Sequence, residues 1–423
     1  MNRSIPSVFL VTLLASMFAT EALANQPGVA TSTHTLPAPA TADSASGQQK
    51  AIKLTEYGLA ARKVKNYPLA ISYYTAALNF YQLLDALIGR CLVYDEAHER
   101  EKSADDAVAT ARIMTNTGTH HEYAVKFYDL AGLDYYLSKK YDKSIASFSE
   151  SISIDPLDPK IYVFRANAYK MKFDFENTLS DLKKAMELDP KSIAAQDSYA
   201  MTFADLGLYQ FAIDKLNDSL VVDKGSSTTY MNLGQVYTSM GKYDEARGNL
   251  NRALQLDPQN WDAVSNSVKL NFYTKNYVAA SRDADTWLDN NRESSPSIDV
   301  EYALIWKHIS SQPQRVDDRA SLEMESVKLR DQNAWPHPII DFFLSKIDAD
   351  QLRAATVNGD AEFLKIRKCE AEAYIGETNL TNGKVDDATK NFETASSLCP
   401  PSWAEYDLSK FELKSIKNSA ALP

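Results

Sequence analysis

The chain has 423 residues, of which 44% are hydrophobic and 24% charged, and its formal net charge is -11. This composition is ordinary for a soluble globular protein. The acidity disfavours nucleic acid and anionic membranes as partners, because their phosphates carry charge of the same sign. With 14 glycines in the whole chain, a glycine-rich nucleotide loop is not expected, and no cofactor is predicted.

The N-terminal segment has the pattern of a secretion signal. Arg3 precedes the apolar stretch 8–19, and a small-x-small cleavage pattern ends at Ala24. The stretch is too short for a permanent membrane span, so we expect a signal peptide at 1–24 and a periplasmic or secreted mature protein. An uncleaved anchor is the alternative, and no later segment is expected to cross a membrane. Residues 25–50 lack a periodic apolar face and are predicted to form a disordered linker.

From about residue 51 onwards, the chain carries a 34-residue period, the signature of a repeat architecture. Aromatic residues recur at this spacing at Tyr141, Phe175, Tyr209, Tyr243 and Tyr277. Prolines, each preceded by aspartate, recur at Pro156, Pro190 and Pro258. A proline ends a helix because it lacks an N–H and restricts the residue before it.

The repeat resembles the tetratricopeptide-repeat (TPR) family, most clearly over residues 227–260. Gly234 and Ala246 are small where the two helices of a hairpin approach most closely, Gly241 lies in the turn between them, and Pro258 stops the second helix. The resemblance implies an all-α fold in which helical hairpins stack into a right-handed superhelix. The first helix of each hairpin lines a concave groove.

The predicted organisation follows from how well each segment fits this repeat. Residues 51–294 form an array of about seven hairpins, with an insertion of about six residues in the second hairpin, placed at 98–106. Residues 295–368 are divergent helical repeats, 369–400 form a terminal TPR hairpin, and 401–423 form a capping helix and tail. Within the divergent part, helices are expected over 300–310, 320–329 and 339–347, interrupted by a bend at Trp335-Pro336.

The C-terminal third resembles a narrower group, the exported bacterial TPR proteins of the cell envelope. The residues that carry this resemblance are Trp335-Pro336, Phe342-Phe343-Leu344 and the stretch from Glu370 to Glu377. The group includes a lipoprotein adaptor, but its lipid-attachment cysteine is absent here, since the first cysteine is Cys91. The resemblance implies a role in envelope assembly or turnover and does not imply docking at a membrane.

Two cysteines lie at opposite ends of the last hairpin. Cys369 opens its first helix and Cys399 closes its second. An antiparallel hairpin brings these ends together, which in an exported protein favours a structural disulfide; free thiols or a redox pair are the alternatives. Cys91 is expected to be a buried, inert thiol.

No catalytic or metal-binding motif is recognisable. The histidines are scattered, and the adjacent pair His120-His121 lacks the further ligands that zinc requires. Nucleophile elbows, phosphate-binding loops and metalloprotease patterns are absent from the sequence. We therefore predict a binding protein, with no catalytic residues and no metal site.

The predicted groove is lined by residues on the first helices of four consecutive hairpins: Leu133, Tyr136, Asn167, Lys170, Met171, Met201, Asp205, Met231, Gln235 and Thr238. Methionine and aromatic side chains at such positions suit a peptide or a partner helix. Asn167 and Asn232 fall where a carboxylate clamp places asparagines, but the lysine partners are missing, so no clamp is expected. The favoured function is a non-catalytic periplasmic scaffold or adaptor, and the alternative is a solute-binding protein for a peptide or glycan.

Overall fold

The computed structural model describes residues 42–117, 121–291, 297–329, 332, 334–357 and 363–420. The expected signal peptide and residues 25–41 of the expected linker lie outside these ranges. Within them, the regular elements are α-helices and one short 3₁₀ helix, so the predicted all-α class is confirmed. The chain divides after Ala195, close to the start of α10 (Ile193–Asp205), into two compact units, called the N-terminal unit and the C-terminal unit. Helix α10 is described with the C-terminal unit, which holds most of it.

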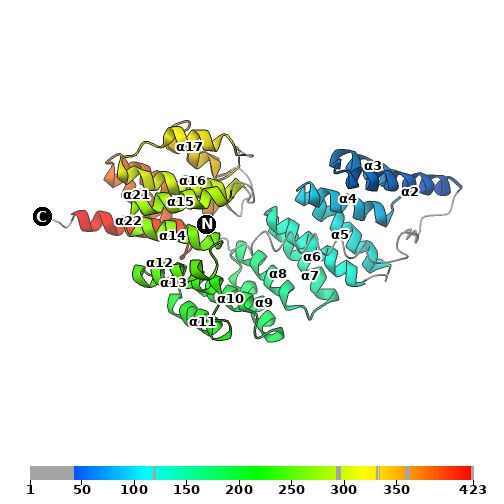
Figure 1. Ribbon diagram of the computed structural model, residues 1–423, viewed down its shortest axis with the longest axis horizontal. Helices are drawn as coiled ribbons and strands as arrows, with labels where there is room; N and C mark the ends of the chain where they lie inside the picture. The colour runs from blue at the N-terminus through cyan, green and yellow to red at the C-terminus, as the bar shows by residue number, and fades with distance from the viewer. Residues whose placement is uncertain are drawn as a thin grey trace. The chain divides into compact units, whose positions relative to one another are not determined.

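The N-terminal unit consists of helices that pack against their neighbours in chain order (Figure 1). They are α2 (Ala42–Lys63), α3 (Tyr67–Phe80), α4 (Leu84–Glu96), α5 (Arg100–Asn116), α6 (His121–Leu137), α7 (Tyr141–Ile154), α8 (Pro159–Met171) and α9 (Phe175–Leu188). Helix α2 begins inside the segment predicted to be linker, so the boundary at residue 50 is corrected to 42. The earlier start brings Gly47 against the end of α3, where a Cβ would lie 3.2 Å from the Phe80 carbonyl oxygen.

The C-terminal unit continues the same pattern and then departs from it. Its helices are α10 (Ile193–Asp205), α11 (Tyr209–Val222), α12 (Ser227–Ser239), α13 (Tyr243–Leu256), α14 (Trp261–Tyr273), α15 (Tyr277–Asn291), α16 (Ser297–Ser311), η1 (Gln312–Gln314), α17 (Arg319–Ser326), α18 (His337–Phe343), α19 (Ala349–Ala355), α20 (Leu364–Thr381), α21 (Val385–Leu398) and α22 (Ala404–Ala420). Helices α16, α17 and α18 correspond to the three predicted in the divergent segment. Helix α19 was not expected.

The 34-residue period reflects a repeated turn. Residues with a left-handed backbone recur at this spacing, with φ values of 62°, 58°, 77°, 72° and 59° at Lys139, Phe173, Gly207, Gly241 and Lys275. Two of the five are glycines, which adopt this conformation without a steric penalty. The second helices end at Ile154, Leu188 and Leu256, two residues before the recurring prolines, as predicted.

The small residues of the repeat lie where helices approach most closely. A Cβ on Gly234 would lie 2.6 Å from Leu250 Cγ, and one on Gly376 would lie 2.7 Å from Phe392 Cε1. Both contacts join the first and second helices of one hairpin. The glycines therefore leave room for a large buried side chain from the partner helix.

The predicted insertion is placed differently by the structure. The turn around His98 has the ordinary left-handed geometry, with φ 59°, so residues 98–106 contain no insertion. Instead, α5 and α6 each have 17 residues, compared with 14 in α7 and 13 in α8. The extra residues lengthen two packed helices, which buries more apolar surface than a longer exposed turn does.

In the N-terminal unit, Arg90 and Arg165 each tie one hairpin to the hairpin before it. Arg165 on α8 forms a two-point ion pair with Asp181 on α9, with both N–O distances 2.8 Å, and donates to Ser149 Oγ on α7 at 2.9 Å. Arg90 on α4 repeats this arrangement with Asp106 on α5 and with a residue on α3. A planar guanidinium fits this geometry, and an ammonium group does not.

Replacing Arg165 with lysine should lower the free energy of unfolding of the N-terminal unit by about 2 kcal/mol, since the charge stays but the bidentate hydrogen bonds are lost. Urea unfolding followed by circular dichroism measures this change. Arg112→Lys on α5 changes an exposed arginine in the same way, and as a control it should change the midpoint much less. Equal midpoints for the two variants would show that Arg165 acts only as a charge.

Candidate partner-binding groove

The ten residues predicted to line the groove lie on the first helices of four hairpins, but their exposure differs between the two units. Leu133 and Tyr136 are on α6, and Asn167, Lys170 and Met171 are on α8, all in the N-terminal unit. The remaining five are on α10 and α12 of the C-terminal unit: Met201, Asp205, Met231, Gln235 and Thr238.

The five residues on α10 and α12 are all buried, with exposures of 3–9%. The segment that covers this face is the chain's own C-terminal part. Ser402 Oγ donates to Asp205 Oδ1 at 2.6 Å, and Gln235 Nε2 donates to the Ser402 carbonyl oxygen at 3.3 Å. The prediction that these five residues form an open groove is therefore wrong.

The same face is held to the start of α22. Ser239 Oγ donates to Asp407 Oδ2 at 2.7 Å, and Tyr273 OH donates to the Ala404 carbonyl oxygen at 3.0 Å. Helix α22, red in Figure 1, packs against α14 as well as against α20 and α21. The predicted capping helix thus has a second role, because it fills the inner face of the hairpins at the start of its own unit.

In the N-terminal unit, most of the predicted positions remain partly accessible. Leu133, Tyr136, Asn167 and Lys170 are half-buried, and Met171 is buried at 8% exposure. The Tyr136 ring packs edge-on against Tyr141, with the centroids 5.5 Å apart. This face of α6 and α8 offers an apolar group, an aromatic ring, an amide and a cation, which suits an extended or helical peptide.

The candidate clamp asparagine of the C-terminal unit has an internal partner. Asn232 is 4% exposed, and its Nδ2 donates to Asp197 Oδ2 at 3.2 Å. Thr229 Oγ1 donates to the same oxygen at 2.8 Å. Burial nevertheless raises the pKa of Asp197 to about 6. Asn232 is thus part of a buried polar network and is not presented to a ligand.

Buried carboxyl groups line the inner side of α20 and α22, a feature that the sequence analysis missed. Glu370 is fully buried and accepts hydrogen bonds from Tyr302 OH at 2.9 Å and from Trp335 Nε1. Glu405 is also fully buried and accepts from Tyr374 OH at 2.8 Å. Burial, reinforced by the nearby Glu405, raises the pKa of Glu370 to about 7.

The cysteines are arranged as expected. Cys369 and Cys399 form a disulfide with their Cα atoms 5.3 Å apart, joining the start of α20 to the end of α21. Cys91 is a free, fully buried thiol whose pKa is raised well above its usual range by burial. An enclosed thiol of this kind is a poor nucleophile.

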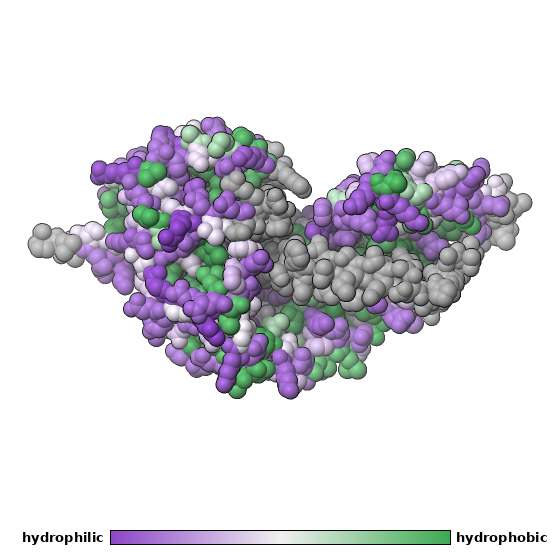
Figure 2. Space-filling view, viewed as in Figure 1, coloured by the Kyte–Doolittle hydropathy of each residue, from purple (hydrophilic) through white to green (hydrophobic). Residues whose placement is uncertain are grey.

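Among the described residues, no three His, Cys, Asp or Glu side chains come together as metal ligands, and no helix in these ranges is long and apolar enough to span a bilayer. His121 is the first residue of α6, and His120 lies outside the described ranges. The face shown in Figure 2 is mostly hydrophilic in both units, with apolar residues in scattered patches.

Antiparallel helical hairpins with a recurring 34-residue turn define a helical-repeat protein of the kind that binds partners along a face of stacked helices. Residues 227–260 match the family model described as "Tetratricopeptide repeat". Residues 227–260 thus form a tetratricopeptide repeat within a chain of helical hairpins.

Several known proteins are similar to parts of the chain, at low sequence identity. The "Lipoprotein NlpI homolog" of Haemophilus influenzae is 23% identical over 218 residues, which cover 51% of this chain and 67% of the relative. The "Hsp70-Hsp90 organizing protein" of Triticum aestivum is 24% identical over 245 residues, 54% of this chain and 39% of the relative. The chain thus spans well under half of the length of the second relative. A solved tetratricopeptide repeat protein from Parabacteroides merdae covers 79% of this chain and 99% of its own, at 14% identity and a TM-score of 0.43.

Proposed function

We propose that the chain is a non-catalytic periplasmic scaffold that binds a protein or peptide partner on the face of α6 and α8. The observation that carries the proposal is the contrast between the units. The chain's own C-terminal segment covers the predicted groove residues of α10 and α12, whereas Leu133, Tyr136, Asn167 and Lys170 stay partly accessible. The resemblance of the C-terminal third to envelope TPR proteins, and a relative named as a lipoprotein, support a role in envelope assembly or turnover.

In-cell crosslinking tests this proposal. A photo-reactive amino acid at position 167 on α8 should capture one abundant envelope protein, identified by mass spectrometry. The same group at the exposed position Lys183 on α9 is the control and should capture much less. Fractionation of the same cells should place the tagged protein in the periplasm.

The double variant Asn167→Asp, Lys170→Glu should abolish capture by a photo-reactive group placed at position 133, since it adds two negative charges and removes the cation from this face. Lys183→Glu carries a matched charge reversal away from the face and should leave capture intact. Equal capture by the parent, the double variant and Lys183→Glu would overturn the proposed site. So would stronger capture by a photo-reactive group at position 183 than by one at position 167.

A further inference from the structure

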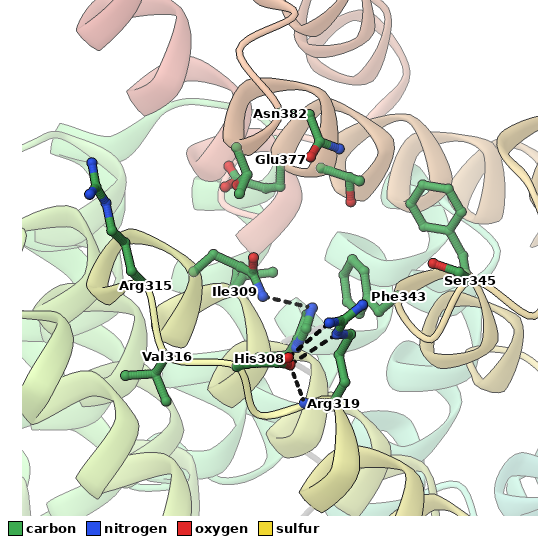
Figure 3. Close-up of a pocket in the computed structure, with 14 residues that line it drawn as sticks. His308, Ile309, Arg315, Val316, Arg319, Phe343, Ser345, Glu377 and Asn382 are labelled. Carbon is green, nitrogen blue, oxygen red and sulfur yellow. Dashed lines mark hydrogen bonds and ion pairs between the residues drawn. The ribbon is translucent and has the colours of Figure 1, made fainter.

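A cavity of about 410 Å³ opens in the C-terminal unit, in the segment where the repeats diverge. Its walls come from the last turns of α16 and α20, the end of α18 and the turn that follows α16 (Figure 3). Helix α18 packs against both α16 and α20 but has only seven residues. The space beyond its end, at Phe343, therefore stays unfilled.

One side of the cavity is apolar and rigid. Ile309 and Phe343 are 2% and 7% exposed, and Phe342 joins them in the lining. The His308 ring stacks near Phe343 with the centroids 4.5 Å apart, and its two nitrogens are held by Asp318 at 2.7 Å and Gln312 at 3.1 Å. This wall offers an apolar surface to a side chain of a ligand.

The opposite side favours a positive group. The last turn of α20 borders this side of the cavity, and a helix C-terminus carries partial negative charge. Glu377 on α20 is 8% exposed, and its Oε1 has no hydrogen-bond partner among the described residues. Figure 3 shows Glu377 and Asn382 on the far side of the opening from His308. An unpartnered buried oxygen is unusual in a protein interior and is satisfied when a ligand supplies a donor.

The rim favours a negative group. Arg315 and Arg319 both line the opening, but the Arg319 guanidinium is engaged by Asp317 at 2.8 and 2.9 Å. Arg315 is exposed and forms no ion pair among the described residues. Arg315 thus stands at the edge of the cavity with its charge available.

We propose that this cavity binds a short zwitterionic peptide of two or three residues, with its α-ammonium group at Glu377 and its carboxylate on Arg315. The volume lies at the small end of the range for ligand sites, and the apolar wall holds one side chain. The site is separate from the face of α6 and α8, so neither proposal depends on the other.

Binding of the peptide should also release a proton from the carboxyl group of Glu377. Burial and the neighbouring Glu412 on α22 raise the pKa of Glu377 well above its usual range. The other titratable groups that interact with it are Tyr273 on α14 and Tyr277 on α15. An ammonium group stabilises the charged carboxylate, so binding should release a proton and should tighten as the pH rises while the amino group of the peptide stays protonated.

Isothermal titration of the full chain with alanyl-leucine tests the proposal. Acetylation of the peptide's amino group, amidation of its carboxyl group, Glu377→Gln and Arg315→Ala should each weaken binding by about tenfold or more. The surface variants Glu393→Gln and Arg252→Ala are matched controls and should bind like the parent. Melting curves confirm that Glu377→Gln is folded, and Arg315 is an exposed turn residue.

Three results would overturn the proposal: no heat of binding at millimolar peptide, equal affinity for the blocked peptides, or an affinity that neither Arg315→Ala nor Glu377→Gln changes. Proton release is measured by repeating the titration in buffers of different ionisation enthalpy. A heat of binding that does not depend on the buffer would show that Glu377 does not hold the ammonium group.

Discussion

Removing the Cys369–Cys399 disulfide should lower the free energy of unfolding of the C-terminal unit by about 3–4 kcal/mol, the chain-entropy value for a closed loop of this length. The two cysteines are 30 residues apart and are both buried, at 0% and 5% exposure. The bond closes the hairpin of α20 and α21, and α22 packs directly on both helices. A looser hairpin therefore also loosens the segment that covers α10 and α12.

Urea unfolding of the double variant Cys369→Ala, Cys399→Ala, compared with the parent under oxidising conditions, measures the effect. Reductant should move the parent towards the variant and leave the variant unchanged. Cys91→Ala, which removes the free thiol of the N-terminal unit, should keep the full sensitivity to reductant. Coincident curves for the parent and the double variant would show that helix packing alone sets the stability of this unit.

Glu370→Gln should remove a large part of the pH dependence of the C-terminal unit. The pKa of Glu370 is raised to about 7 in the folded protein, above its ordinary value in an unfolded chain. The folded state then holds a proton that the unfolded state has released, so stability is highest at low pH and falls as the pH rises through 7. Between pH 5 and pH 8, this single group should contribute a loss of about 2 kcal/mol.

The amide of the variant cannot be ionised, so the variant should not lose this stability as the pH rises. Between pH 5 and pH 8, its free energy of unfolding should therefore improve relative to that of the parent by about 2 kcal/mol. The variant also loses an acceptor for Tyr302 or Trp335, which adds a penalty that does not depend on pH. Glu393→Gln, an exposed change on α21, should show no such shift. A flat difference for Glu370→Gln would mean that the carboxyl group is already ionised at pH 5.

Local features of the fold were predictable because they depend on residues close together in the chain. The spacing of Gly207, Gly241 and the prolines marks turns and helix ends, and these positions are confirmed. The hairpin of Cys369 and Cys399 was found for the same reason. The insertion was misplaced because residues 98–106 are rich in charge, which is typical of a loop, whereas most of them form the start of α5 and are charged on its exposed side.

The candidate site was predicted less well, for a physical reason. Hairpin periodicity identifies the inner face of α12, but it gives no information on what covers that face. Gln235 and Ser402 belong to segments with unrelated local patterns, and only the folded chain brings them together. The cavity beside Glu377 likewise results from the short α18, whose length no sequence signal fixed.

The covering of α10 and α12 by the C-terminal segment also changes how the C-terminal unit should fold. In an open repeat array each hairpin contacts only its neighbours, so folding can begin anywhere and spread along the chain. Here hydrogen bonds join residues 131, 167, 168 and 197 positions apart, which raises the contact order. The unit should therefore fold more slowly than a linear array of equal size, and its first and last helices should exchange their amide protons in one cooperative event.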